Sequence, residues 1–176
     1  MKKYNNIIVP TDGSVNSKRA LEHAVVIASS LGATITLVYV ANIVSVISNF
    51  DQIPNASGYV TEQVALDMEE EGKGILDEFA KSIPQNIEVK SVFEVGSPGP
   101  AVLSVAKKYN ADLIIADEGH KLKENRSQQS KTMHTLGDHA RYKLLLTGTL
   151  ITNREIDAYS QYRYLNSRIF GTSFYA

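Results

Sequence analysis

The sequence contains no cysteine, which excludes a disulfide framework and thiolate metal sites. An excess of charge of one sign is also absent: 18 basic against 19 acidic residues leave a formal net charge of -1, which would attract neither nucleic acid nor an anionic membrane. The opening "MKKYNNIIVPTDGS" holds too short an apolar run for a secretion signal, and no segment approaches the roughly 20 apolar residues of a membrane span. We therefore expect a cytoplasmic protein without nucleic-acid or membrane partners.

A phosphate-binding loop of the form G-x-x-x-x-G-K-[ST] is missing as well. The nearest string is "EEEGKGI", in which Gly72 and Lys73 are followed by Gly74 instead of serine or threonine, and Asp67 takes the place of the first glycine. The sequence also lacks a Gly-x-Ser-x-Gly elbow and a cysteine nucleophile. We therefore expect no phosphoryl-transfer motor and no covalent hydrolase.

Apolar strands alternate with amphipathic helices along the whole chain, which predicts an α/β fold with a parallel sheet covered on both faces. The apolar runs predict strands at 5–10, 33–40, 86–95, 111–117 and 141–149. The helical periods predict helices at 14–32, 61–83, 98–110, 127–140 and 153–166, with a long loop at 41–60. Ser97 is the expected cap of the third helix, and Pro98 takes its first position. The prediction is one α/β domain over residues 1–176, a three-layer sandwich with a five-stranded parallel sheet.

Two aspartates end predicted strands, at the edge where such sheets bind ligands. Asp12 follows the first strand, and two interpretations stay open: contact with a nucleotide, or a turn residue that caps the next helix. Asp117 ends the fourth strand and is followed by Glu118. A divalent ion needs several oxygen ligands, so we favour solvated acids here, although Asp12 would add a ligand if the two strands are neighbours.

The strand, Pro-Thr-Asp turn and Ala-rich helix of "YNNIIVPTDGSVNSKRALEHAVVIASSLGATITLVYV", the loop after it, and "GSPGPAVLSVAKKYNADLII" together resemble the universal stress protein family over residues 1 to about 115. The resemblance implies a flavodoxin-like, Rossmann-like fold and a homodimer. It also implies adenine and ribose contacts at the first two strand ends, at Pro10, Thr11, Asp12 and Val40.

ATP-binding members of that family carry, after the fourth strand, glycines spaced G-2x-G-9x-G followed by serine or threonine. The matching positions here are Asp117, His120, Ser130 and Lys131, so every glycine is replaced. The resemblance therefore implies at most weak binding of ATP or another adenine nucleotide, with Mg²⁺ as its companion ion.

From residue 112 onward the motifs "DEGH", "LLLTGT" and "YRYLNSRIFG" resemble the SNF-type helicase-like ATPases. This resemblance implies that Asp117 and Glu118 match an acidic magnesium motif. His120 would connect that motif to the coupling segment, which holds Thr147, Gly148 and Thr149. Without a phosphate loop, we interpret His120 as a surface or strand-end histidine and the coupling segment as the end of a strand.

The two resemblances meet in "ADLII", which indicates a chimera. Both parents run strand, helix, strand at this point, so the second can supply the helix and strand that the first lacks. Because the last strand of the stress-protein family is replaced, the replacement argues against the homodimer that the family implies. Three function classes remain: a chimera with at most weak nucleotide binding and no catalysis, an ATP-binding universal stress protein, and a fragment of an SNF-type ATPase. We expect the first.

Overall fold

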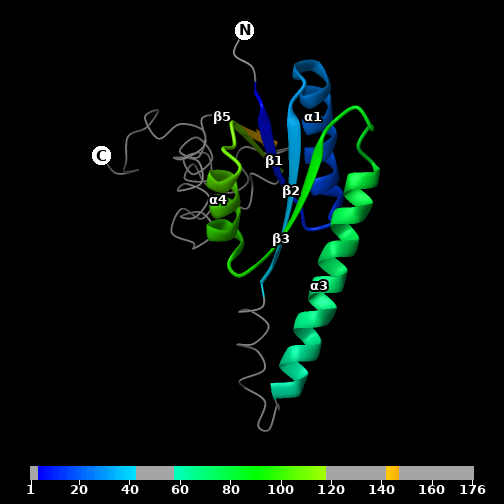
Figure 1. The fold of residues 1–176 in the computed structure, drawn as a ribbon, viewed down its shortest axis with the longest axis vertical. Helices are drawn as coiled ribbons and strands as arrows, with labels where there is room; N and C mark the ends of the chain where they lie inside the picture. The colour runs from blue at the N-terminus through cyan, green and yellow to red at the C-terminus, as the bar shows by residue number, and fades with distance from the viewer. Residues whose placement is uncertain (1–3, 43–57, 118–141, 147–176) are drawn as a thin grey trace, which may run out of the picture.

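The computed structural model describes residues 4–42, 58–117 and 142–146, and their side chains within 4–42 and 63–115. Parallel strands form one sheet in this part of the chain, with helices on both faces (Figure 1). The elements in chain order are β1 (Asn6–Pro10), α1 (Val15–Leu31), β2 (Thr34–Ala41), α3 (Gly58–Lys81), β3 (Val89–Val95), α4 (Pro98–Lys108), β4 (Leu113–Asp117) and β5 (Tyr142–Leu146). The predicted α/β class and five-stranded parallel sheet are confirmed.

The strand order β3-β2-β1-β4-β5 places β1 at the centre of the sheet. The chain moves from β1 outward to β3 on one side and then returns to start β4 on the other side of β1. This reversal lies between β1 and β4, where Ile7 pairs with Leu113 and Ile8 with Ile114. In open parallel sheets the ligand crevice forms at such a reversal, beyond the carboxyl ends of the strands.

Strand β5 adds to β4 in register, with Leu113 opposite Tyr142 and Asp117 opposite Leu146. The predicted fifth strand is therefore confirmed, although it is shorter than the expected range 141–149. The helices expected at 127–140 and 153–166 lie outside the described residues. A strand from the helicase-like part of the sequence thus extends the sheet that the stress-protein-like part begins.

Side chains alternate between the two faces of the sheet, and each face has its own apolar core. One core joins α1 and α3 to strand residues such as Ile7, Leu37 and Ile115. The other joins α4 to Ile8, Val38, Val92 and Ile114. Because β1 and β2 contribute to both cores, their central residues are buried on both sides of the sheet.

The predicted loop at 41–60 is wrong at both ends. Ala41 still belongs to β2, and α3 already begins at Gly58. Glycine costs a helix only about 1 kcal/mol, so it did not stop the first turn from forming. The first half of α3 extends beyond the carboxyl edge of the sheet (Figure 1), and accordingly its apolar residues Val64 and Met68 are only half-buried.

Candidate functional site

The turn after β1 is held by its own backbone and by short polar side chains. Thr11 donates its N–H to the Val38 carbonyl at 2.8 Å, which ties the end of β1 to β2. The Thr11 hydroxyl is buried and donates to Ser17 Oγ at 3.2 Å. It also accepts the Gly13 N–H at 3.3 Å. Thr11, one of the predicted contact residues, therefore shapes the turn from inside the fold.

Asp12 lies exposed at the tip of this turn. Its Oδ1 accepts the Ser14 N–H at 3.0 Å, and Ser14 in turn caps α1 by accepting the Ser17 N–H at 3.2 Å. Asp12 is thus a turn residue just before the helix, whereas the helix cap that we had considered for it is Ser14. The position at the carboxyl edge also keeps the carboxylate accessible to a ligand.

Val40 lies where β2 continues past the end of β1. Even-numbered residues of β2 direct their backbone groups toward β1, as the bonds from Thr34 N–H to Asn5 O and from Thr11 N–H to Val38 O show. The next ladder partners would be Thr11 O and Gly13 N–H, but the chain turns away there. Within the described residues, Val40 N–H and C=O therefore face the end of β1 without a ladder bond.

Tyr39, the neighbour of Val40 on β2, is a feature that sequence reasoning missed. Partial burial raises the pKa of its phenol, and the carboxylates of Glu71 and Asp12 raise it further. Its ring stacks on Phe93, with centroids 6.0 Å apart and planes 10° from parallel. A glycine in an amphipathic helix, Gly72, was the available signal that something bulky packs closely there.

The string that most nearly matched a phosphate loop lies inside α3. A Cβ on Gly72 would be 2.6 Å from Tyr39 Cδ1 and 2.7 Å from Phe93 Cε2, so this glycine lets the helix approach β2 and β3 closely. Its neighbour Gly74 faces open space. A phosphate loop needs its backbone N–H groups free, whereas these belong to a helix. The interpretation that "EEEGKGI" is no phosphate loop is confirmed.

The acidic end of β4 lies next to the β1 turn. Ile8 of β1 pairs with Ile114 of β4. Thr11 and Asp117 each follow their member of this pair by three residues, so the two strand ends lie side by side. The strands that end near Asp12 and Asp117, β1 and β4, are therefore neighbours, which was the condition for Asp12 to act together with Asp117. In the part of the chain that the structure describes, no group of three or more metal-ligating side chains forms. Glu118, His120, Thr147, Gly148 and Thr149 lie outside the described residues.

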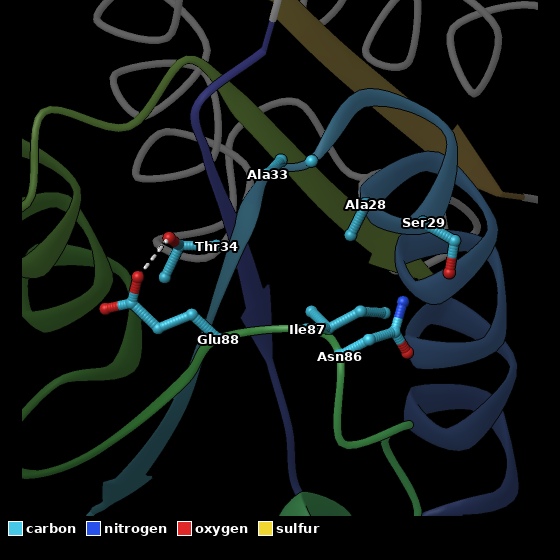
Figure 2. Close-up of a pocket in the computed structure, with 8 residues that line it drawn as sticks. Ala28, Ser29, Ala33, Thr34, Asn86, Ile87 and Glu88 are labelled. Carbon is cyan, nitrogen blue, oxygen red and sulfur yellow. Dashed lines mark hydrogen bonds between the residues drawn. The ribbon is translucent and has the colours of Figure 1, made fainter.

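A cavity of about 180 Å³ lies at the opposite, amino edge of the sheet, between the end of α1 and the turn before β3 (Figure 2). Its lining includes Ser29, Asn86 and Ile87, while Thr34 donates to Glu88 Oε2 at 3.2 Å beside it. It contains none of the predicted site residues. The carboxyl edge therefore remains the candidate site, because backbone groups beyond β1 and the strand reversal converge there.

The model of the universal stress protein family matches residues 3–124. The chain belongs to this family. A second model, the SNF2-related domain, matches residues 75–174, so the chain also belongs to that family over its later part. The two matches overlap over residues 75–124, which include β3, α4 and β4. Both resemblances predicted from the sequence are confirmed.

Curated relatives repeat this division. A universal stress protein of Methanocaldococcus jannaschii is 29% identical over 113 residues, covering 64% of this chain and 63% of the relative. A DNA repair and recombination protein RAD54-like of Mus musculus is 37% identical over 71 residues, covering 40% of this chain. The chain spans 9% of the length of the RAD54-like protein, so it corresponds to a small part of that relative.

Solved structures show the same fold at low sequence identity. The hypothetical protein MJ0577 is similar with a TM-score of 0.65 and 17% identity over 87% of this chain and all of its own. A universal stress protein in complex with cAMP has a TM-score of 0.54 and 17% sequence identity, covering 84% of this chain and all of its own. A universal stress protein family protein of Arabidopsis thaliana with AMP bound has a TM-score of 0.52 and 12% sequence identity, covering 82% of this chain and 93% of its own.

None of the helices in the described part of this stress-protein family member has the length and apolar character needed to cross a bilayer.

Proposed function

We propose that the chain is a chimeric universal-stress-protein-like domain that binds adenine nucleotides weakly at the carboxyl edge of its sheet and catalyses no reaction. The observation that carries the proposal is the Val40 backbone, whose N–H and C=O extend past the end of β1. A backbone donor beside an acceptor complements the N1 acceptor and the N6 amino group of adenine. The structures with cAMP and with AMP bound support an adenine ligand in this fold.

The ribose would then lie over the β1 turn. Asp12 is exposed there and fixed by its bond from the Ser14 N–H. A carboxylate that accepts hydrogen bonds from ribose hydroxyls is a common recognition device in nucleotide-binding α/β folds. Val40 and Asp12 would thus recognise adenosine, the part of the ligand that carries no charge.

Phosphate groups would meet an unfavourable field. β4 ends at Asp117 beside the β1 turn, and the glycines of ATP-binding members are replaced. At about 4 Å and an effective dielectric constant near 20, two like charges repel by roughly 4 kcal/mol. This repulsion would remove most phosphate-derived affinity, unless Mg²⁺ bridges Asp117 and the phosphates. We therefore propose that ATP gains affinity over adenosine only with a divalent ion.

Calorimetric titration with adenosine, AMP and ATP, each with magnesium and with a chelator, tests this proposal. We expect similar weak binding of all three ligands under chelation, and a gain for ATP with magnesium. Asp12→Asn should weaken adenosine binding, whereas Asp77→Asn, an exposed acid on α3, should leave it unchanged. Tight ATP binding that needs no metal and survives Asp12→Asn would contradict the site.

The SNF2-related match supports a second candidate, an ATPase fragment. We propose that the chain has no ATPase activity. Phosphoryl transfer depends on a positioned γ-phosphate and metal, and the phosphate-loop sequence is missing. Measurement of ATP turnover with and without DNA tests this. Turnover that DNA stimulates and that Glu118→Gln abolishes would establish the ATPase candidate instead.

We also propose a homodimer, because membership in the stress-protein family favours one and β5 occupies the edge of the sheet beside β4, where the sequence suggested a replaced strand. We further propose a cytoplasmic protein without nucleic-acid partners, which the near-neutral net charge favours.

A further inference from the structure

The cavity at the amino edge of the sheet lies where the hydrogen-bond ladder between β2 and β3 begins (Figure 2). The first bond of this ladder runs from the Ile35 N–H to the Glu88 carbonyl at 2.9 Å. One step further toward the edge, the regular pattern would pair the Glu88 N–H with the Ala33 carbonyl. Within the described residues that bond is not formed, and neither group has another backbone partner. Because both residues line the cavity, its wall carries an unpaired backbone donor and an unpaired backbone acceptor.

The end of α1 adds further acceptors on the neighbouring wall. A helix leaves its last four carbonyls without partners inside the helix, and the Gly32 N–H returns here only to the Ala28 carbonyl, at 2.8 Å. In the part of the chain that the structure describes, no backbone N–H reaches the three carbonyls that follow, those of Ser29, Ser30 and Leu31. The last turn of α1 also contains no basic side chain to offset the negative end of the helix dipole. This end of the helix therefore favours a cation and disfavours a phosphate or a carboxylate.

Side chains give the cavity an apolar floor between two polar ends (Figure 2). Ser29 and Asn86 lie at one end, and both are exposed. Thr34 and Glu88 lie at the other end, where the Thr34 hydroxyl donates to Glu88 Oε2 at 3.2 Å. The floor between them consists of buried alkyl groups, those of Ala28, Ala33 and Ile87. A ligand that fits this cavity therefore combines a short hydrocarbon part with a polar group.

The formal charges around the cavity are few. Glu88 supplies one negative charge, and the Lys90 ammonium lies 3.4 Å from Glu88 Oε1. The same ammonium lies 5.8 Å from the centroid of the Tyr109 ring, which packs on the α4 face of the sheet. Lys90 is thus drawn toward α4, and none of the described residues that line the cavity is basic. The free carbonyls on the α1 side therefore have no positive side chain among their lining neighbours.

We propose that this cavity binds a small primary alkylammonium ion, with the ammonium at the end of α1 and the alkyl chain over the apolar floor. An ammonium group has three donors and no acceptor, which suits the carbonyls of Ala33 and of the helix end. Its methylene groups cover Ala28 and Ile87, as the stem of a lysine side chain covers apolar surface. The volume of about 180 Å³ is several times the roughly 30 Å³ of one water molecule, so a ligand with a few heavy atoms fits.

Other ligand classes match these groups less well. An anion would meet the carbonyls of α1 and the Glu88 carboxylate, and a neutral alcohol would satisfy fewer acceptors than an ammonium does. A divalent metal ion takes several oxygen ligands, whereas no group of three or more metal-ligating side chains forms among the described residues. The inference does not rest on the proposed nucleotide site, which lies at the opposite, carboxyl edge of the sheet, so the two can fail separately.

Amide NMR spectra of the isotopically labelled full chain test the proposal, with n-butylammonium chloride as the probe. At pH 7 this amine is protonated, because primary alkylamines resemble the lysine side chain with its pKa of about 10.4. We expect saturable shifts of the amides of Gly32, Ala33 and Glu88, with a dissociation constant on the order of 1 mM, and none at the β1 turn. We expect n-butanol, sodium butyrate and potassium chloride at the same concentrations to give no saturable shifts at the cavity.

A tethered competitor locates the ammonium. Ser29→Lys places a charged amine beside the last carbonyls of α1, which a lysine near a helix end can bind. It should therefore raise the dissociation constant of butylammonium roughly tenfold. Ser104→Lys adds the same side chain at an exposed position of α4 that does not line the cavity, and it should leave binding unchanged. Amide shifts away from each substituted residue verify that both variants are folded.

Asn86→Asp tests the recognition of charge with almost no change in shape. An added carboxylate at this exposed rim should lower the dissociation constant about twofold to fivefold, as expected for an exposed ion pair. Asn110→Asp is the matched control, because it makes the same exchange at an exposed residue that does not line the cavity. It should have no effect on binding.

The proposal is overturned if butylammonium causes no saturable shift at the cavity. Equal shifts with n-butanol would show that the apolar floor alone binds, and equal shifts with potassium would show a site for inorganic cations. Either result contradicts an alkylammonium site. Unchanged binding in Ser29→Lys would place the ammonium elsewhere and refute the location.

Discussion

At the scale of single residues, Gly72 explains how α3 meets the sheet. Glycine inside a helix is normally unfavourable, but here any larger residue would collide with the stacked rings of Tyr39 and Phe93. Gly74, two residues later, faces open space and has no such role. The two glycines of one short string therefore have opposite structural consequences, and they form a matched pair for experiment.

We predict that Gly72→Ala destabilises the protein and that Gly74→Ala stabilises it. The added methyl at position 72 is overpacked, which costs about 1–3 kcal/mol before a helix-propensity gain of about 1 kcal/mol is subtracted. At position 74 only the gain remains, about 0.5–1 kcal/mol. Urea unfolding of both variants measures the difference. Equal effects at the two positions would show that α3 does not approach the rings as described.

Tyr39 connects the same contact to the candidate site. Burial, Glu71 and Asp12 all raise the pKa of its phenol above the ordinary value of 10.0. The unfolded chain thus loses this proton first as the pH rises, so the free energy of unfolding should fall from about pH 10 toward the folded pKa. Tyr39→Phe should remove this part of the alkaline loss.

Titration of tyrosinate absorbance, taken as the difference between wild type and Tyr39→Phe, checks this prediction. Glu71→Gln should lower the pKa of Tyr39, whereas Glu70→Gln, one residue away on α3, should change it less. A pKa of Tyr39 that does not respond to Glu71→Gln would mean that this carboxylate does not act on the phenol.

At the scale of elements, α1 shows how the β1 turn and a helix start depend on each other. Asp12 accepts a hydrogen bond from the Ser14 N–H, and Ser14 caps the helix. The Ser17 hydroxyl donates to the Ser14 carbonyl at 2.9 Å. Gly32 ends the helix in the left-handed conformation at φ 67°, where glycine is favoured. Both ends of α1 are thus defined by local chemistry, which is why the sequence located them correctly.

We predict that Ser14→Ala lowers the free energy of unfolding by about 1 kcal/mol, because the Ser17 N–H loses its cap. Ser30→Ala is the control: its hydroxyl bonds back to the Val26 carbonyl at 2.9 Å inside the helix, where alanine is at least as favourable. Thermal unfolding of the two variants compares them. Similar destabilisation by both would argue against a specific capping role of Ser14.

At the scale of the whole molecule, the sheet unites segments that belong to two families. β1 and β2 lie in the stress-protein match alone, β5 lies in the SNF2-related match alone, and β3 and β4 belong to both. The two matches share one sheet because β4 pairs with β1 on one side and with β5 on the other, all in parallel. Pairing in a parallel sheet uses backbone groups, so it depends on strand and crossover geometry and not on which family a strand comes from.

We predict that residues 1–176 unfold as one cooperative unit. β5 has no sheet partner except β4 in the described part of the chain, so its hydrogen bonds should be lost together with the core. Calorimetry should give equal calorimetric and van't Hoff enthalpies, and the amides of 142–146 should exchange with protection similar to those of β4. Two separate transitions, or unprotected β5 amides, would contradict a single domain.

The sequence by itself determined the elements, because their signals are local. Apolar periods marked the strands and helices, the predicted range 14–32 enclosed α1, and the missing glycines after β4 weakened the case for ATP. The start of α3 was missed, since residues 58–60 carry no period distinct from a loop. Strand periodicity alone does not determine which strands are neighbours, as pairing depends on contacts between distant residues.

Only the tertiary structure decided how those pieces act together. The sheet order places Asp117 beside the β1 turn, and the end of β1 leaves the Val40 backbone facing the candidate site. The close approach at Gly72 and the raised pKa of Tyr39 likewise depend on groups from different elements. Local sequence specifies the conformation of a segment, whereas burial, backbone pairing and charge proximity are properties of the assembled chain.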